Sequence, residues 1–479
     1  MKNVFTLFLG LFLLAAGSSL LRAEEPTLPA GLAGAVNRGS EEPELPAGLE
    51  DEGAGEPKLP PGLAPEEAES GKRTGGEQPS VGRRDRLGVP LHGFLEARLG
   101  PRLRSDATQS KDATLGEVRL QLETAKYLDA GSFDLTGDLL FDGIAEEFDF
   151  DLRQARFTFS PMPSVDVRAG RQVLSWGTGD LLFINDLFPK DWVSFLSGRD
   201  VEYLKAPGDA VKLGWFRNLL NLDIVYTPRF DPDRFIDGER LSYWNGELGM
   251  IAGEDHRISA KEPDDWFDDD EIAVRIYRNV AGYEFAMYGY SGFWKSPAGQ
   301  DPATGRAIFP KLNVYGASLQ GPLGPGIANM EFGYYDSRED RAGDDPMIDN
   351  SEIRFLIGYE QELAREFTGS FQYYLEHMQD YTEYREGVPP SAEPRDEDRH
   401  LLTLRLTKLL MNQDLTLSLF TFYSPSDRDA YFRPQAGYKI DDSWTVLVGG
   451  NLFFGEERHT FFGRFEDNSN VYVSLRHSF

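Results

Sequence analysis

Apolar and polar residues alternate along most of the chain after about residue 88. In TLGEVRLQLE, Val118, Leu120 and Leu122 share one face, while Glu117, Arg119, Gln121 and Glu123 share the other. The same alternation returns in GSFDLTGDLLFD, PSVDVRAGRQ, SEIRFLIGYE, HLLTLRLTK and SWTVLVGGNLFF. A period of two is typical of β-strands with two different faces. Such strands can build either a soluble sandwich or a membrane barrel.

The lengths of the connections separate these two folds. About eighteen segments of roughly ten residues follow one another, each long enough to cross a bilayer as a tilted strand. Short connections, such as those at 161–163, 217–218 and 441–442, alternate with long ones, such as 177–207, 229–270 and 379–398. Outer-membrane barrels have tight periplasmic turns and long extracellular loops. The pattern therefore predicts an all-β fold, a transmembrane antiparallel β-barrel of about 18 strands.

The last nine residues, VYVSLRHSF, continue the alternation to the final position. Val471, Val473, Leu475 and Phe479 fall on one face of a predicted strand. In a closed barrel this strand pairs with the first, so that no sheet edge is left in lipid. A terminal alternating strand that ends in Phe is typical of an assembly signal, so we expect the barrel-assembly machinery as a partner.

The N-terminal region differs in composition from the rest. Residues 1–23 combine Lys2 with an apolar run and a small residue at Ala23, which predicts a signal peptide and secretion to the outer membrane. Residues 24–87 are rich in Pro, Gly and Glu and predict a disordered periplasmic arm. The arm contains EEPTLPAGL, EEPELPAGL and GEPKLPPGL, which are either docking peptides for a periplasmic protein or a duplicated spacer. The barrel is expected over 88–479.

Composition narrows the classes of function. The net charge of -30 argues against a nucleic-acid partner, and the absence of cysteine excludes disulfides and thiolate metal sites. No apolar run after the N-terminus is long enough for a spanning helix, and the mean hydropathy is -0.43. No GxSxG motif or histidine cluster is present, so we expect no enzyme, although a serine and histidine on a barrel rim stay an open alternative.

Several stretches resemble the alginate-export family of outer-membrane barrels. They are VDVRAGRQVLSWGTGD followed by INDLFPKDW, then LDIVYTPRFDPDRF, YGYSGFWKSP and the ending FFGRFEDNSNVYVSLRHSF. The resemblance spans most of 88–479 and does not reach the repeat region. It implies an eighteen-stranded barrel acting as a passive pore in contact with outer-membrane lipid and lipopolysaccharide. A conduit for a polyuronate should have a basic lumen, however, and the expected lumen is mixed.

The polar face of each predicted strand should point into the lumen, so the charged residues on that face are the candidate pore-lining residues. They are Arg98, Arg119, Arg156, Arg168, Arg171, Arg275, Arg354 and Arg405, with Asp180 and Asp186 in the long loop that follows the GRQ strand. We hypothesise that this loop, 177–207, folds into the lumen as a constriction in which Asp180, Asp186, Lys190 and Asp191 face the path. The alternative is that the arginines only pair with acids on neighbouring strands.

The loop at 229–270 ends in EPDDWFDDDE. Its aspartates, Asp264, Asp265, Asp268, Asp269 and Asp270, could hold Ca2+ or form a solvated acidic loop at the mouth. Their spacing does not match an EF-hand. No other cofactor is expected.

Two functions fit this sequence. The first is an outer-membrane porin for passive diffusion of small polar or charged solutes. The second is the barrel of a polysaccharide-export or electron-conduit complex, recruited through the N-terminal repeats.

Overall fold

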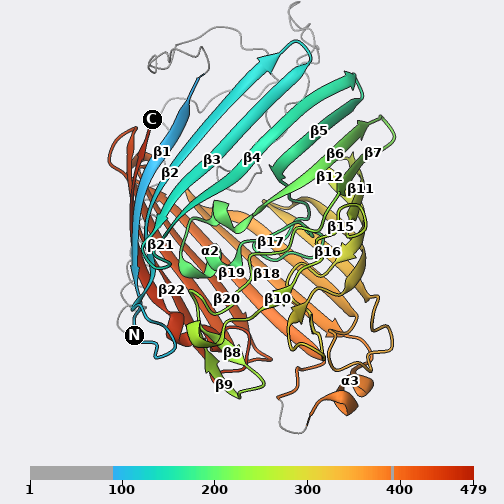
Figure 1. Ribbon diagram of the computed structural model, residues 1–479. Helices are drawn as coiled ribbons and strands as arrows, with labels where there is room; N and C mark the ends of the chain where they lie inside the picture. The colour runs from blue at the N-terminus through green and yellow to red at the C-terminus, as the bar shows by residue number, and fades with distance from the viewer. Residues whose placement is uncertain (1–89, 390–392) are drawn as a thin grey trace, which may run out of the picture.

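The structure, a computed structural model, describes residues 90–389 and 393–479. Eighteen strands form one antiparallel sheet, which closes into a barrel where the first strand, β1, pairs with the last, β23 (Figure 1). The predicted fold class and strand number are confirmed. The expected signal peptide, the arm and its three repeats lie outside the described residues. None of the helices among the described residues has the length and apolar content to cross a bilayer.

The barrel strands are β1 (His92–Pro101), β2 (Ala113–Leu128), β3 (Gly131–Asp142), β4 (Glu147–Met162), β5 (Val165–Val173), β6 (Pro207–Phe216), β7 (Asn221–Thr227), β11 (Glu271–Val280), β12 (Tyr283–Phe293), β15 (Lys311–Leu323), β16 (Gly326–Ser337), β17 (Glu352–Ala364), β18 (Phe367–Met378), β19 (Asp398–Leu410), β20 (Leu415–Ser424), β21 (Asp429–Lys439), β22 (Trp444–Gly455) and β23 (Asn470–Ser478). The connections contain short strands β8 (Tyr243–Asn245), β9 (Met250–Ala252), β10 (Ala260–Lys261), β13 (Gly299–Gln300) and β14 (Ala307–Ile308). They also contain helices α2 (Trp192–Ser197) and α3 (Tyr381–Gly387) and the 3-10 turns Val201–Leu204, Glu254–His256, Met411–Gln413 and Gly463–Asn468.

The alternation of the sequence becomes two faces of the barrel wall. Leu95 and Leu99 of β1 are 48% and 61% exposed on the outer face, whereas Glu96 and Arg98 between them are buried on the inner face. The same division holds around the barrel, with exposed Val118, Leu139, Ile276 and Phe371 pointing outward. An outer belt of apolar side chains is what a lipid bilayer requires of a transmembrane barrel.

The last strand closes the sheet as the C-terminal pattern predicts. The backbone groups of Gly93 and Phe479 donate to each other, with N to O distances of 3.2 and 3.0 Å. Val473, Leu475 and Phe479 are exposed on the lipid-facing side. The predicted face of the strand is therefore confirmed, and its role as an assembly signal stays a prediction.

The two rims differ in the length of their connections. At one rim every connection leaves two or four residues between strands, as at 281–282 and 411–414. Ala281 and Gly282 both have positive φ, 53° and 84°, which is typical of a type I′ hairpin turn. The other rim holds the long connections, together with α3 and the β8–β9 hairpin (Figure 1). Two of its connections, 143–146 and 425–428, are also short.

Candidate functional site

The lumen face carries most of the arginines that the strand alternation assigns to it. Register and burial place seven of them on the inner side of the wall: Arg98, Arg119, Arg156, Arg168, Arg275, Arg354 and Arg405. Arg171 is different. It shares the outer face of β5 with Val173 and lies opposite Asp209, which is on the same face of β6 as the exposed Val211. The assignment of Arg171 to the lumen is wrong, because a residue next to the lumen-facing Gln172 must point the other way.

Acidic partners accompany most of these arginines. Arg119 pairs with Asp138 at 2.5 Å, and Arg156 pairs with Asp134 at 2.9 Å. Arg275 pairs with Glu284 on the neighbouring strand. Arg168 is an exception, because it forms no ion pair within 4.0 Å among the described residues and its direct cross-strand neighbour is Lys212. The lumen is thus mixed in charge, and cross-strand pairing accounts for most of its arginines.

Residues 174–206, the connection between β5 and β6, fold back into the barrel; we call them the inserted segment. Helix α2 belongs to this segment and lies in the middle of the barrel in Figure 1. Asp191 caps the N-terminus of α2 through its carboxylate, which accepts from the Ser194 amide, and Gly198 caps the C-terminus with φ of 109°. The predicted insertion of this loop into the lumen agrees with the structure.

One end of the segment is held by Glu331 of β16. The carboxylate is 1% exposed and accepts from the Gly179 amide at 2.7 Å and from the Asn185 side-chain amide at 2.9 Å. It also accepts from the Thr178 amide, the Thr178 hydroxyl and the Asn185 amide. Five donors on one buried carboxylate stabilise its charge and fix the chain around it.

Asp180 attaches the same stretch to β18 and β19. Its carboxylate pairs with Arg405 at 2.6 Å, and its backbone exchanges two hydrogen bonds with the side-chain amide of Gln372 at 2.7 and 2.9 Å. Gln372 is 2% exposed and also donates to the Thr403 hydroxyl. Gln372 is uncharged, so it is not among the candidate residues that the sequence indicates.

The far end of the segment is attached to the opposite part of the wall. Arg433 of β21 donates to the carbonyls of Phe195 and Arg199 at 3.2 and 2.6 Å, and Arg98 of β1 donates to the Gly198 carbonyl at 2.6 Å. Arg199 pairs with Glu117 of β2 at 2.9 Å. The segment therefore crosses the lumen, with contacts to strands on both sides.

Apolar packing fills the space between these polar contacts. Ile184, Phe195 and Leu204 of the segment are almost fully buried, together with Tyr431 and Phe453 of the wall. The ring of Phe195 packs edge-on against that of Tyr431 at 5.8 Å between centroids. At this level the barrel contains a packed core instead of a wide aqueous channel.

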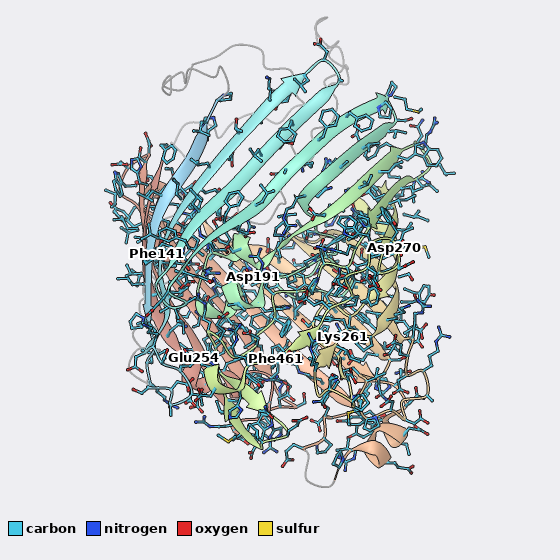
Figure 2. All side chains as sticks on the ribbon, viewed as in Figure 1. Phe141, Asp191, Glu254, Lys261, Asp270 and Phe461 are labelled. Carbon is cyan, nitrogen blue, oxygen red and sulfur yellow. The ribbon has the colours of Figure 1, made fainter. Side chains whose placement is uncertain are left out.

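Asp186, Lys190 and Asp191 do not line an open path. Lys190 pairs with Asp186 at 2.9 Å, and all three side chains are at most 5% exposed. Asp191, labelled in Figure 2, lies inside the barrel and pairs with Arg234 at 3.2 Å. The expectation that these three face the solute is wrong, because buried charges must be paired and here they pair within the loops.

The acidic stretch at 264–270 forms a tight turn near the rim. The Asp265 amide donates to the Asp269 carboxylate, and the Asp269 amide donates to the Asp265 carbonyl, both at 3.0 Å. Within 90–389 and 393–479 no group of three or more histidine or carboxylate side chains is arranged to hold a metal ion. The structure thus does not bring Asp264, Asp265, Asp268, Asp269 and Asp270 together as a Ca2+ site.

Comparison with known proteins supports the fold. No protein-family model matches the chain, and no curated protein matches it. The crystal structure of Acinetobacter baumannii OccAB3 is 10% identical, with a TM-score of 0.50 over 82% of this chain and 99% of that one. The chain shares its barrel fold. Pseudomonas aeruginosa OccK11 (OpdR) is 9% identical over 82% and 96% of the two chains, with a TM-score of 0.47. Salmonella typhi OmpF is 9% identical over 82% and 97%, with a TM-score of 0.41.

The insertion of the segment should depend on pH. Burial raises the pKa of the Asp180 carboxyl although Arg405 opposes the shift, and burial likewise raises the pKa of Asp233, which accepts from the Lys190 amide. A raised pKa means that these carboxyls bind protons more tightly when the segment is inserted than when it is released. The inserted state is therefore destabilised as the pH rises through the raised pKa and stabilised as the pH falls, and an inserted segment narrows the lumen. Lowering the pH from about 7 towards the ordinary carboxyl value near 4 should therefore reduce open-state conductance. Single-channel recording over this range checks the sign, and an increase on acidification would contradict it.

Proposed function

We propose that the protein is an outer-membrane porin through which small polar or charged solutes diffuse passively. The observation that carries the proposal is a closed transmembrane barrel with a charged inner face, crossed by one of its own loops. A loop that narrows the lumen restricts passage to small solutes, and the charged groups on either side of it replace part of their hydration. The expected outer-membrane location, with lipid and lipopolysaccharide around the apolar belt, belongs to this proposal.

The excess of acidic residues at the mouth of the barrel favours the entry of cations over that of anions. In the connection 228–270, acidic residues outnumber basic ones by 13 to 5. A concentrated negative charge at an entrance raises the local concentration of cations. The lumen arginines oppose this effect only weakly, since most of them are paired.

Planar-bilayer conductance of the full chain tests the function. We expect stable ohmic current steps and, in a KCl gradient, a reversal potential of the sign for cation selectivity. A protein that inserts without conducting would contradict the porin proposal. A reversal potential of the opposite sign would show that lumen cations such as Arg168, which forms no ion pair within 4.0 Å among the described residues, set the selectivity.

The inserted segment argues against the alternative of a sheath around a partner protein. Such a sheath needs space in its lumen, and residues 174–206 occupy that space with contacts to β16, β18, β19, β21, β1 and β2. The finer hypothesis of membership in the alginate-export family rests on the sequence stretches alone. The paired, mixed charges of the lumen favour small solutes over a polyanion.

A further inference from the structure

The barrel wall is incomplete between β4 and β5. Strand β3 pairs with β4 as far as Glu147, but β5 pairs with β4 only from Ala155 onward. Among the described residues, no strand pairs with the other edge of 147–154. Eight residues of strand correspond to about 26 Å along the chain. Phe148 and Phe150, which point outward on this stretch, are 83% and 59% exposed, with β3 on one side of them and none of the described strands on the other.

Side chains and loops close this gap in place of a backbone ladder. Arg171 donates to the Leu152 carbonyl at 2.7 Å, and Arg153 donates to the Lys205 carbonyl at 3.1 Å. Arg234 of the 228–270 connection pairs with Asp151 at 2.8 Å. Contacts of this kind, with the Arg234 side chain 41% exposed, contribute far less than a strand ladder and can separate locally.

A cleft of about 430 Å³ lies at the gap. Its lining includes Arg171, which is on the outer face of the wall, and Ala206 and Asp233, which are buried behind it. Arg171 and the lipid-facing Val173 share one face of β5, so the cleft reaches the outer surface of the wall. Asp231 lines both the cleft and a second, apolar cavity inside the wall, next to Phe188 and Val225. The cleft thus leads from the lipid side towards the lumen.

Carboxylates outnumber arginines in the lining of the cleft, which contains Asp231, Asp233, Asp237 and Glu262 but only Arg171 and Arg234. Both of its arginines are occupied, Arg171 by Asp209 and Arg234 by Asp151 and Asp191. In contrast, the carboxylates of Asp231, Asp233 and Glu262 form no ion pair with a lysine or arginine side chain within 4.0 Å in the part of the chain that the structure describes. Asp233 instead accepts hydrogen bonds from the Lys190 amide and the Trp192 indole at 2.7 and 3.0 Å. Phe235, Ile258 and Ala260 add apolar surface to the same cleft. A ligand that matches this surface combines an apolar body with a positive charge.

We propose that the gap between β4 and β5 is a lateral entrance, through which amphipathic cations pass between the outer leaflet and the lumen. This route goes beyond the diffusion pore proposed above, because its solutes arrive from the membrane instead of the aqueous mouth. The Arg234 and Asp151 pair is the contact that must open.

Ethidium, a permanent cation with a large apolar body, is a suitable probe. Vesicles that contain the full chain and enclose DNA report its entry as a rise in fluorescence, and KCl conductance is measured on the same preparations. Ile258→Trp narrows the cleft, and the double variant Asp231→Asn/Glu262→Gln removes two of its four carboxylates. The matched control is Glu383→Gln/Glu386→Gln on α3, which is exposed in another connection.

We expect both cleft variants to slow ethidium entry by about fivefold or more, since a local charge raises association rates at least that much. The control variant should behave as wild type, and Ile258→Trp should leave KCl conductance unchanged. Equal entry in all variants would overturn the lateral route, as would a parallel loss of ethidium entry and KCl conductance in Ile258→Trp. Ethidium entry that depends on the cleft in a barrel without KCl conductance would support the lateral route and refute the diffusion pore.

Discussion

Deletion of residues 181–198 should raise single-channel conductance about threefold or more, because it removes the packed layer that crosses the lumen. The deleted stretch includes the buried Ile184 and Phe195 and the whole of α2. The wall is left intact, since β5 ends at Val173 and β6 begins at Pro207. Planar-bilayer recording of the deletion variant beside wild type measures the effect.

The matched control shortens the tip of the β8–β9 hairpin by residues 246–249. This hairpin projects from the long-loop rim in Figure 1 and does not belong to the inserted segment. The control should conduct as wild type does. If the deletion of 181–198 conducted no better than the control, residues 174–206 would not be the constriction.

Glu331→Ala should release the segment without shortening it. The variant leaves five donors in a buried site without their acceptor, and each costs about 1–3 kcal/mol when it stays unpaired. A loss of about 3 kcal/mol changes the ratio of inserted to released segment by a factor of about 100. We expect noisy currents with frequent large openings, and protease cleavage within 174–206 that wild type resists.

Glu360→Gln is the control for this variant. Glu360 faces the lumen from β17, next to β16, and forms no ion pair within 4.0 Å among the described residues. Its substitution should leave both the current noise and the protease resistance unchanged. Quiet currents in Glu331→Ala would mean that Asp180, Arg405 and the apolar packing hold the segment without Glu331.

The sequence predicts the strands of the barrel wall better than it predicts the contacts of the inserted segment. Alternation assigns Arg98, Arg119 and Arg405 to the inner face because side-chain direction in a strand depends only on position along it. Arg171 is misassigned for a local reason, since the GRQ motif places two polar residues in succession and only one can face inward. Loop length correctly indicates an insertion at 177–207.

The contacts that hold the insertion could not be read from the sequence. Gln372 and Arg199 form specific bonds across 192 and 82 residues, and no local pattern indicates such partners. A buried charge also looks the same in sequence as one that faces water. Asp186 and Lys190 are therefore easily taken for pore-lining residues, although they pair with each other inside the loop.

The order of folding follows from how the inserted segment is attached. Asp180 binds a residue 225 positions later in the chain, and Phe195 binds one 238 positions later. The contacts that hold Asp180 and Phe195 therefore cannot form until β16 to β21 have been added to the sheet, although Arg98 and Glu117 precede the segment in the chain. Contacts of such large sequence separation form late because their loop-closure entropy must be offset first. Each newly assembled barrel should thus pass through a stage with an unobstructed interior, and the cell envelope would be briefly leaky at every such event.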